Sequence, residues 1–124
     1  MSEKIEKNVT TIGLTEANHE MLTKFKEDKI FHEMMDGYRF AIAYSINQDI
    51  EPSVLTEKTK TTFNVGSLDP KKEIYNAIIA LNPDIKIPVY RYAELLAESG
   101  MTELARIYKQ NNRLDIAKIV ADSS

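Results

Sequence analysis

A chain of 124 residues, 43% of them hydrophobic and 28% charged, can bury a core of its own, which excludes a disordered chain. The lack of cysteine excludes a disulfide framework and thiolate metal ligands, and it suits the reducing cytoplasm. A formal net charge of −3 excludes a general attraction to nucleic acid, so any such binding needs a local basic patch.

Neither a targeting signal nor a membrane span is predicted. Residues 1–7 are charged and lack an apolar core, and no apolar run reaches the roughly 20 residues that cross a bilayer. The length predicts one domain, and the absence of these segments favours a cytoplasmic protein without membrane association. Its best internal boundary, at 52–59, separates an N-terminal unit (9–50) from a helical C-terminal unit (63–121).

The N-terminal unit begins with a β-prone segment. Residues 9–14 favour a short strand, and Thr15 then stands at the N-cap position of an amphipathic helix over 16–27. A short connection leads from this helix to the most apolar part of the chain.

The segment 36–48 predicts the central helix. Arg39 is its only charged residue after Asp36, and apolar side chains at helical spacing cover most of its circumference. We expect Asp36 to cap the helix and Ile42 to be buried in the core.

The C-terminal unit reads as helical. Residues 61–65 predict a short strand or an extended loop, and Asp69 is the expected N-cap of a helix that starts at Pro70 and stops at Asn82. Further helices are predicted after this one, the first of them closed by Gly100 as its C′ residue; their ranges are 88–99, 102–110 and 114–121. The fold class is therefore mainly α, with a short N-terminal strand, a helix pair and about three C-terminal helices.

A resemblance covers residues 9–48. The step Ile12-Gly-Leu14-Thr15 and the helix start Asp36-Gly-Tyr-Arg-Phe-Ala-Ile-Ala resemble the ribbon-helix-helix DNA-binding regulators of bacteria. The resemblance implies a homodimer whose paired strands enter the major groove. Its outward positions lack the long polar side chains that read base edges, which implies that base reading is lost or moved; they are Val9, Thr11 and Gly13.

The strand also predicts a homodimer on physical grounds. An isolated strand leaves amides and carbonyls unpaired, which invites pairing with a second copy of the chain. The next β-prone segment, 61–65, lies beyond two helices, and pairing with it inside one chain is the alternative.

A second resemblance covers residues 15–48. This helix pair, whose second member is rich in alanine and aliphatic residues, is similar to the small helical accessory subunit of bacterial DNA phosphorothioation systems. That similarity implies an accessory protein that works beside DNA.

The candidate nucleic-acid site is a basic stretch with small polar residues between its lysines. Lysines beside amide and hydroxyl groups suit phosphate contacts, although an ordinary solvated loop has the same composition. The residues of this candidate site are Lys58, Lys60, Asn64, Lys71 and Lys72.

Catalytic and metal chemistry have little support in the sequence. His19 and His32 lack metal-ligand spacing, so we expect no metal and no cofactor. Glu94 and Glu98 stand four residues apart on an expected amphipathic helix, where solvated carboxylates are the expectation and an acid–base pair the alternative.

The leading functional hypothesis is a non-enzymatic, DNA-associated regulator or accessory subunit that binds mainly phosphates. The alternative is a protein-interaction adaptor whose helical C-terminal half docks a larger partner. The acidic net charge favours the adaptor, and the ribbon-helix-helix resemblance favours DNA.

Overall fold

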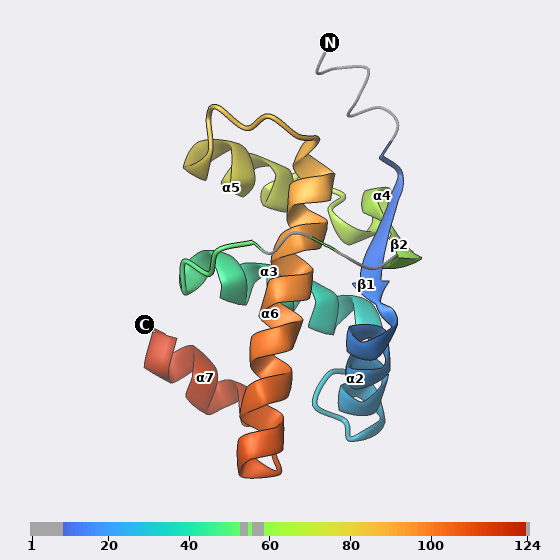
Figure 1. Cartoon of the computed structure of the whole chain (residues 1–124), viewed down its shortest axis with the longest axis vertical. Helices are drawn as coiled ribbons and strands as arrows, with labels where there is room; N and C mark the ends of the chain where they lie inside the picture. The colour runs from blue at the N-terminus through green and yellow to red at the C-terminus, as the bar shows by residue number, and fades with distance from the viewer. Residues whose placement is uncertain (1–8, 53–54, 56–58, 124) are drawn as a thin grey trace.

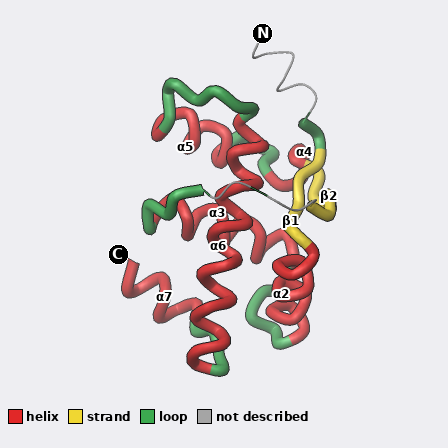
Figure 2. Tube along the Cα trace, viewed as in Figure 1, coloured by secondary structure: helices red, strands yellow, loops and turns green. Residues whose placement is uncertain are grey.

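The computed structural model describes residues 9–52, 55 and 59–123 (Figure 1). Strand β1 (Thr11–Thr15) runs directly into helix α2 (Glu16–Glu27). The remaining elements are α3 (Met34–Asn47), β2 (Thr59–Asn64), α4 (Val65–Leu68), α5 (Glu73–Leu81), α6 (Val89–Asn111) and α7 (Ile116–Ser123). Helices dominate the trace in Figure 2, which confirms the predicted mainly-α fold with its short N-terminal strand.

Helix α6 is the longest element, and the others pack around it (Figure 1). Its 23 residues run straight through Gly100, so the prediction of two helices separated at this glycine was wrong. A glycine is tolerated inside a helix where another backbone approaches closely. The helix ends instead at Asn112, which adopts the left-handed conformation with φ 57°.

Gly100 is the point where α3 crosses α6. A Cβ atom here would overlap the carbonyl oxygen of Ala41 and lie 2.8 Å from Ser45 Oγ. The same Ser45 hydroxyl donates a hydrogen bond of 2.7 Å to the carbonyl oxygen of Leu96. Ile42 is 1% exposed, which confirms its predicted burial.

The two strands of the described part of the chain pair with each other. Antiparallel pairing places Ile12 opposite Phe63 and Leu14 opposite Lys60, with a bulge after Ile12. The segment 61–65, for which a short strand or an extended loop was expected, contributes to β2 except for Val65, which starts α4, and β2 pairs with β1 within one chain. The unpaired-strand argument no longer requires a second copy, and the homodimer stays a prediction.

Helix starts differ from the predictions by a few residues. Helix α5 begins at Glu73 rather than Pro70, yet the Asp69 carboxylate still accepts the amides of Ile74 at 2.9 Å and Tyr75 at 3.0 Å. Helix α3 begins at Met34, two residues before the expected cap. Asp36 accepts the amide of Glu33 at 3.2 Å from inside the first turn.

One hydrophobic core joins both predicted units. Ile12, Leu22 and Tyr38 from the first unit are as fully buried as Ile78 and Leu104 from the second. Among the described helices, none is both long enough and apolar enough to span a membrane.

Gly100→Ala should destabilise the fold. The added methyl meets the rigid backbone of Ala41, and overpacking of this kind costs about 1–3 kcal/mol. That cost exceeds the gain in helix propensity of about 0.5–1 kcal/mol. Urea titration should show a lower midpoint. In the control Gly66→Ala, the new methyl meets only the Asn64 side chain, at 3.0 Å, and the midpoint should move much less. Equal midpoints would contradict the close crossing of α3 and α6.

Candidate functional site

Two buried carboxylates on α6 form the most unusual polar cluster of the described structure. Glu94 is 3% exposed and Glu98 is 9% exposed, so the expectation of solvated side chains was wrong. A buried carboxylate is stable only where donors replace its water. The donors here come from β1, α2, β2 and α6 itself.

Glu98 holds the junction between β1 and α2. Its carboxylate accepts the Thr15 amide at 3.0 Å and the Thr15 hydroxyl at 2.7 Å. It also accepts Asn18 Nδ2 at 2.7 Å, and Asn18 is itself buried on α2. Thr15 stands at the predicted N-cap of α2, but its hydroxyl binds Glu98 and makes no cap hydrogen bond.

Glu94 accepts hydrogen bonds from both strands of the sheet. Its Oε2 atom accepts the Gly13 amide at 2.9 Å and the Thr59 hydroxyl at 3.0 Å. Its Oε1 atom accepts Arg91 Nη1 at 3.0 Å, one turn earlier on α6. The carboxylate therefore ties both strands to the long helix.

Tyr38 completes this cluster from α3. Its hydroxyl donates to the Gly13 carbonyl oxygen at 2.9 Å, and its ring packs against Phe63 with 4.4 Å between centroids. Burial, and next the negative charges of Glu94 and Glu98, raise the pKa of this phenol well above its usual value, so it stays a donor.

The cluster is structural. Each carboxylate oxygen already accepts a hydrogen bond, and no buried side-chain nitrogen or oxygen of the described residues lacks a partner. An acid–base pair needs room for substrate, which these contacts occupy. The sequence did contain a signal for this burial, because Glu94 and Glu98 lie beside the apolar stripe of α6. The predicted helix stopped at Gly100, so the part of the stripe from Met101 onward was not counted with it.

The predicted basic site is exposed where the structure describes it. Lys60, Lys71 and Lys72 are exposed, as is Asn64, while Lys58 lies outside the described residues. Lys60 and Asn64 both belong to β2, but the bulge between them interrupts the alternation of faces: Lys60 stands opposite Leu14, and Asn64 stands opposite Thr11.

Two of these side chains have local contacts. Asn64 Oδ1 accepts the Gly66 amide at 2.8 Å and so caps α4. The Lys72 ammonium lies 5.1 Å from the ring centroid of Tyr75. Lys60 lies in β2, whereas Lys71 and Lys72 stand just before α5. In the same part of the chain, no group of three or more His, Asp or Glu side chains could hold a metal ion.

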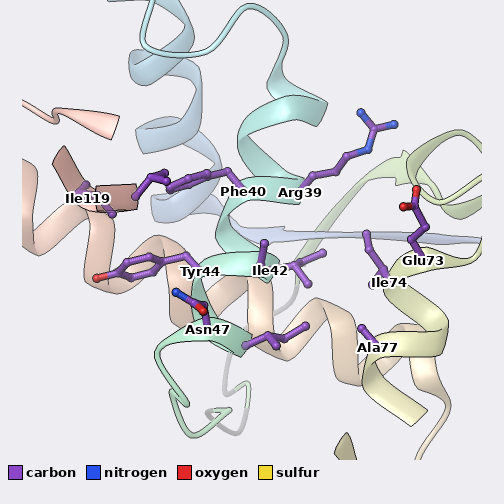
Figure 3. A pocket seen from close by; sticks show the side chains of 12 residues that line it. Arg39, Phe40, Ile42, Tyr44, Asn47, Glu73, Ile74, Ala77 and Ile119 are labelled. Carbon is purple, nitrogen blue, oxygen red and sulfur yellow. The ribbon is translucent and has the colours of Figure 1, made fainter. Parts of the chain in front are cut away.

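A groove between α3, α5 and α7 has a mainly apolar lining, and the sequence did not predict it (Figure 3). Its floor is the outward face of α3, with Phe40, Tyr44 and Ile46 half-buried. Its volume is about 570 Å³, within the range of about 300–1,000 Å³ typical of ligand pockets.

The walls of this groove are apolar as well. Ile74 and Ala77 line it from α5, and Ile119 lines it from α7 on the other side (Figure 3). Val120 of α7 is also part of the lining. Val120 is 52% exposed although it is aliphatic. The groove is thus bounded on three sides by side chains that would lose contact with water if another molecule filled it.

Charged groups occupy one end of the groove. Arg39 Nε donates to the Leu68 carbonyl oxygen at 2.8 Å, and Arg39 Nη2 donates to that of Ser67 at 2.9 Å. Arg39 also pairs with Asp36 at 3.4 Å, so its charge is engaged. Glu73, exposed at the start of α5, has no hydrogen bond or ion pair from its side chain to any residue in the described ranges.

Comparison of the chain with protein-family models, with curated proteins and with solved structures gives no match. The function is therefore argued from the geometry of these surfaces.

Glu98→Gln should destabilise the protein. An amide replaces one acceptor oxygen by a donor that faces other donors, and a buried group left without its partner costs about 1–3 kcal/mol. Thermal unfolding should show a clearly lower Tm. Glu103→Gln is the control, because Glu103 pairs with Arg106 at the surface, where ion pairs contribute little. Matching Tm values for the two variants would show that the Glu98 contacts contribute no net stability.

The basic stretch can be tested with duplex DNA at low salt. If the stretch binds phosphates, Lys71→Glu with Lys72→Glu should weaken the gel shift of all sequences alike, because phosphate contacts carry no sequence information. Lys26→Glu with Lys109→Glu makes the same charge change on exposed positions of α2 and α6 and should weaken binding less. Unchanged affinity in the first variant would remove this site.

Proposed function

We propose that the protein is a non-enzymatic adaptor, and that the groove between α3, α5 and α7 docks an amphipathic helix of a larger protein partner. The observation that carries the proposal is the apolar lining of the floor and both walls. Amphipathic helices bind such grooves by inserting one apolar stripe and keeping their polar face in water.

The length of the groove favours a helix as its occupant. Its floor follows α3 from Arg39 to Asn47, which is about 12 Å at 1.5 Å per residue. A docked helix inserts side chains at positions i, i+3, i+4 and i+7, and these span about 10 Å along its axis. Two turns of helix therefore match the floor.

The charge at the end of the groove favours a basic residue on that helix. Glu73 is exposed there, while the guanidinium of Arg39 is held by two carbonyl oxygens and by Asp36. A lysine or arginine that flanks the apolar stripe would meet Glu73. The expected partner sequence thus combines an i, i+3, i+4, i+7 apolar pattern with one basic residue at its end.

Nucleic-acid binding remains the second candidate. The exposure of Lys60, Lys71 and Lys72 is compatible with phosphate contacts, but exposure is the ordinary state of a lysine. The cis pairing of β1 with β2 also leaves the ribbon of the DNA-binding resemblance without its predicted partner strand. The adaptor proposal rests on an apolar groove, which is a more specific feature than exposed lysines, so it is the leading candidate.

The docking proposal predicts that helical peptides can be selected against the protein and that one groove substitution abolishes their binding. A displayed library with apolar residues at i, i+3, i+4 and i+7 and a variable flanking charge is the probe. Ala77→Arg places a charge against the apolar lining and should weaken selected peptides at least about tenfold, equivalent to about 1.4 kcal/mol.

Asn76→Arg is the matched control, since Asn76 is the exposed neighbour of Ala77 and does not line the groove. It should retain peptide binding, and Glu73→Gln should remove the preference for a flanking basic residue. A failure to select any helical peptide, or equal affinities for the Ala77 and Asn76 variants, would overturn the proposal.

A further inference from the structure

We infer that α7 is a movable wall, open in this structure, that can also close the groove against α5 when no helix is docked. This inference deepens the proposed function, because it gives the same groove a closed and an open state. It rests on how α7 is anchored, on which of its side chains are buried, and on what lies opposite them.

Helix α7 is anchored at its start. Leu114, just before it, is 7% exposed and belongs to the core. The Asp115 carboxylate then accepts the Lys118 amide at 3.1 Å and caps the first turn. The whole helix has only eight residues, Ile116–Ser123, too few for a helix that is stable without packing. Its position therefore depends on the contacts of one face.

That face is only partly covered. Ile116, Ile119 and Val120 share one side of α7 by helical spacing, and the first two are half-buried against the core. Val120, farther from the anchor, is 52% exposed and lines the groove. Burial of the apolar stripe thus decreases away from Leu114.

The opposite wall of the groove is apolar as well. Ile74 and Ala77 of α5 line the other side of the groove, and the two walls face each other across α3 in Figure 3. A rotation of α7 about Leu114 towards α5 would bring apolar side chains together and remove them from water. Lys118 and Asp122 are exposed and lie outside the groove lining, so this motion leaves these charges of α7 in water.

Closure can be trapped because the chain contains no cysteine. In the variant Ala77→Cys with Val120→Cys, the two thiols lie on opposite walls and can join only when their Cα atoms come within about 7 Å. Mild oxidation of dilute protein should give an intramolecular disulfide, measured by mass and by mobility on a non-reducing gel. The control pair, Ala77→Cys with Ala121→Cys, places the second thiol off the apolar stripe.

The expected result is a disulfide that forms at least about tenfold faster in the Val120 variant than in the Ala121 variant, since effective concentration falls steeply where geometry prevents approach. Oxidised Val120 variant should lose binding of the selected helical peptides, and reduction should restore it. Equal rates in the two pairs, or no disulfide in either, would overturn closure.

A second measurement covers the case in which a double variant does not fold. The thiol of Ala77→Cys should react with a maleimide several-fold faster when Val120→Asp is added, because a charge opposes closure. The thiol of Asn76→Cys, on the exposed side of α5, should be unaffected by Val120→Asp. No acceleration at position 77 would contradict closure. These readouts need no partner, so they are decided independently of whether peptides bind.

Discussion

The fold depends on hydrogen bonds between the buried carboxylates of α6 and the amides of β1. Glu94 and Glu98 accept the amides of Gly13 and Thr15, on the edge of β1 that does not face β2. Carboxylates buried without donors would be strongly destabilising, and an unpaired strand edge would invite another chain. The strand amides thus supply the donors that the carboxylates need, and the carboxylates supply the acceptors for those amides. The long helix thereby fixes the position of the strand pair and closes the edge that a second strand could have used.

The crossing of α3 and α6 has a consequence on the far side of α3. Gly100 and Ser45 allow the two backbones to approach closely, and this contact uses the inner face of α3. The helix is apolar around most of its circumference, however, so its outer face also needs cover. Helices α5 and α7 cover it only in part, and the groove is the part that remains.

The groove and Lys60 of the basic stretch lie on separate parts of the molecule, whereas Lys71 and Lys72 directly precede Glu73 at the end of the groove. The groove opens between α3, α5 and α7, whereas Lys60 and Asn64 belong to β2, which lies on the other side of α6 from α7 in Figure 1. Docking of a helix and phosphate contacts at Lys60 would therefore not compete for the same residues. A scaffold that does both remains compatible with an accessory role, and the variants at Ala77 and at Lys71 with Lys72 separate the two activities.

Local pattern was sufficient for much of the fold. The sequence by itself determined helix α2, the burial of Ile42 and the stop of α5 after Leu81, because capping, periodicity and proline act over a few residues. The exposed positions of Lys60, Lys71 and Lys72 also followed from residue type. Only the tertiary structure decided that α6 continues through Gly100, that Glu94 and Glu98 are buried, and that β1 pairs with β2. Those outcomes depend on partners some 35 to 83 residues away in the sequence, and local periodicity carries no information about contacts at that separation. The groove likewise exists only once three helices meet.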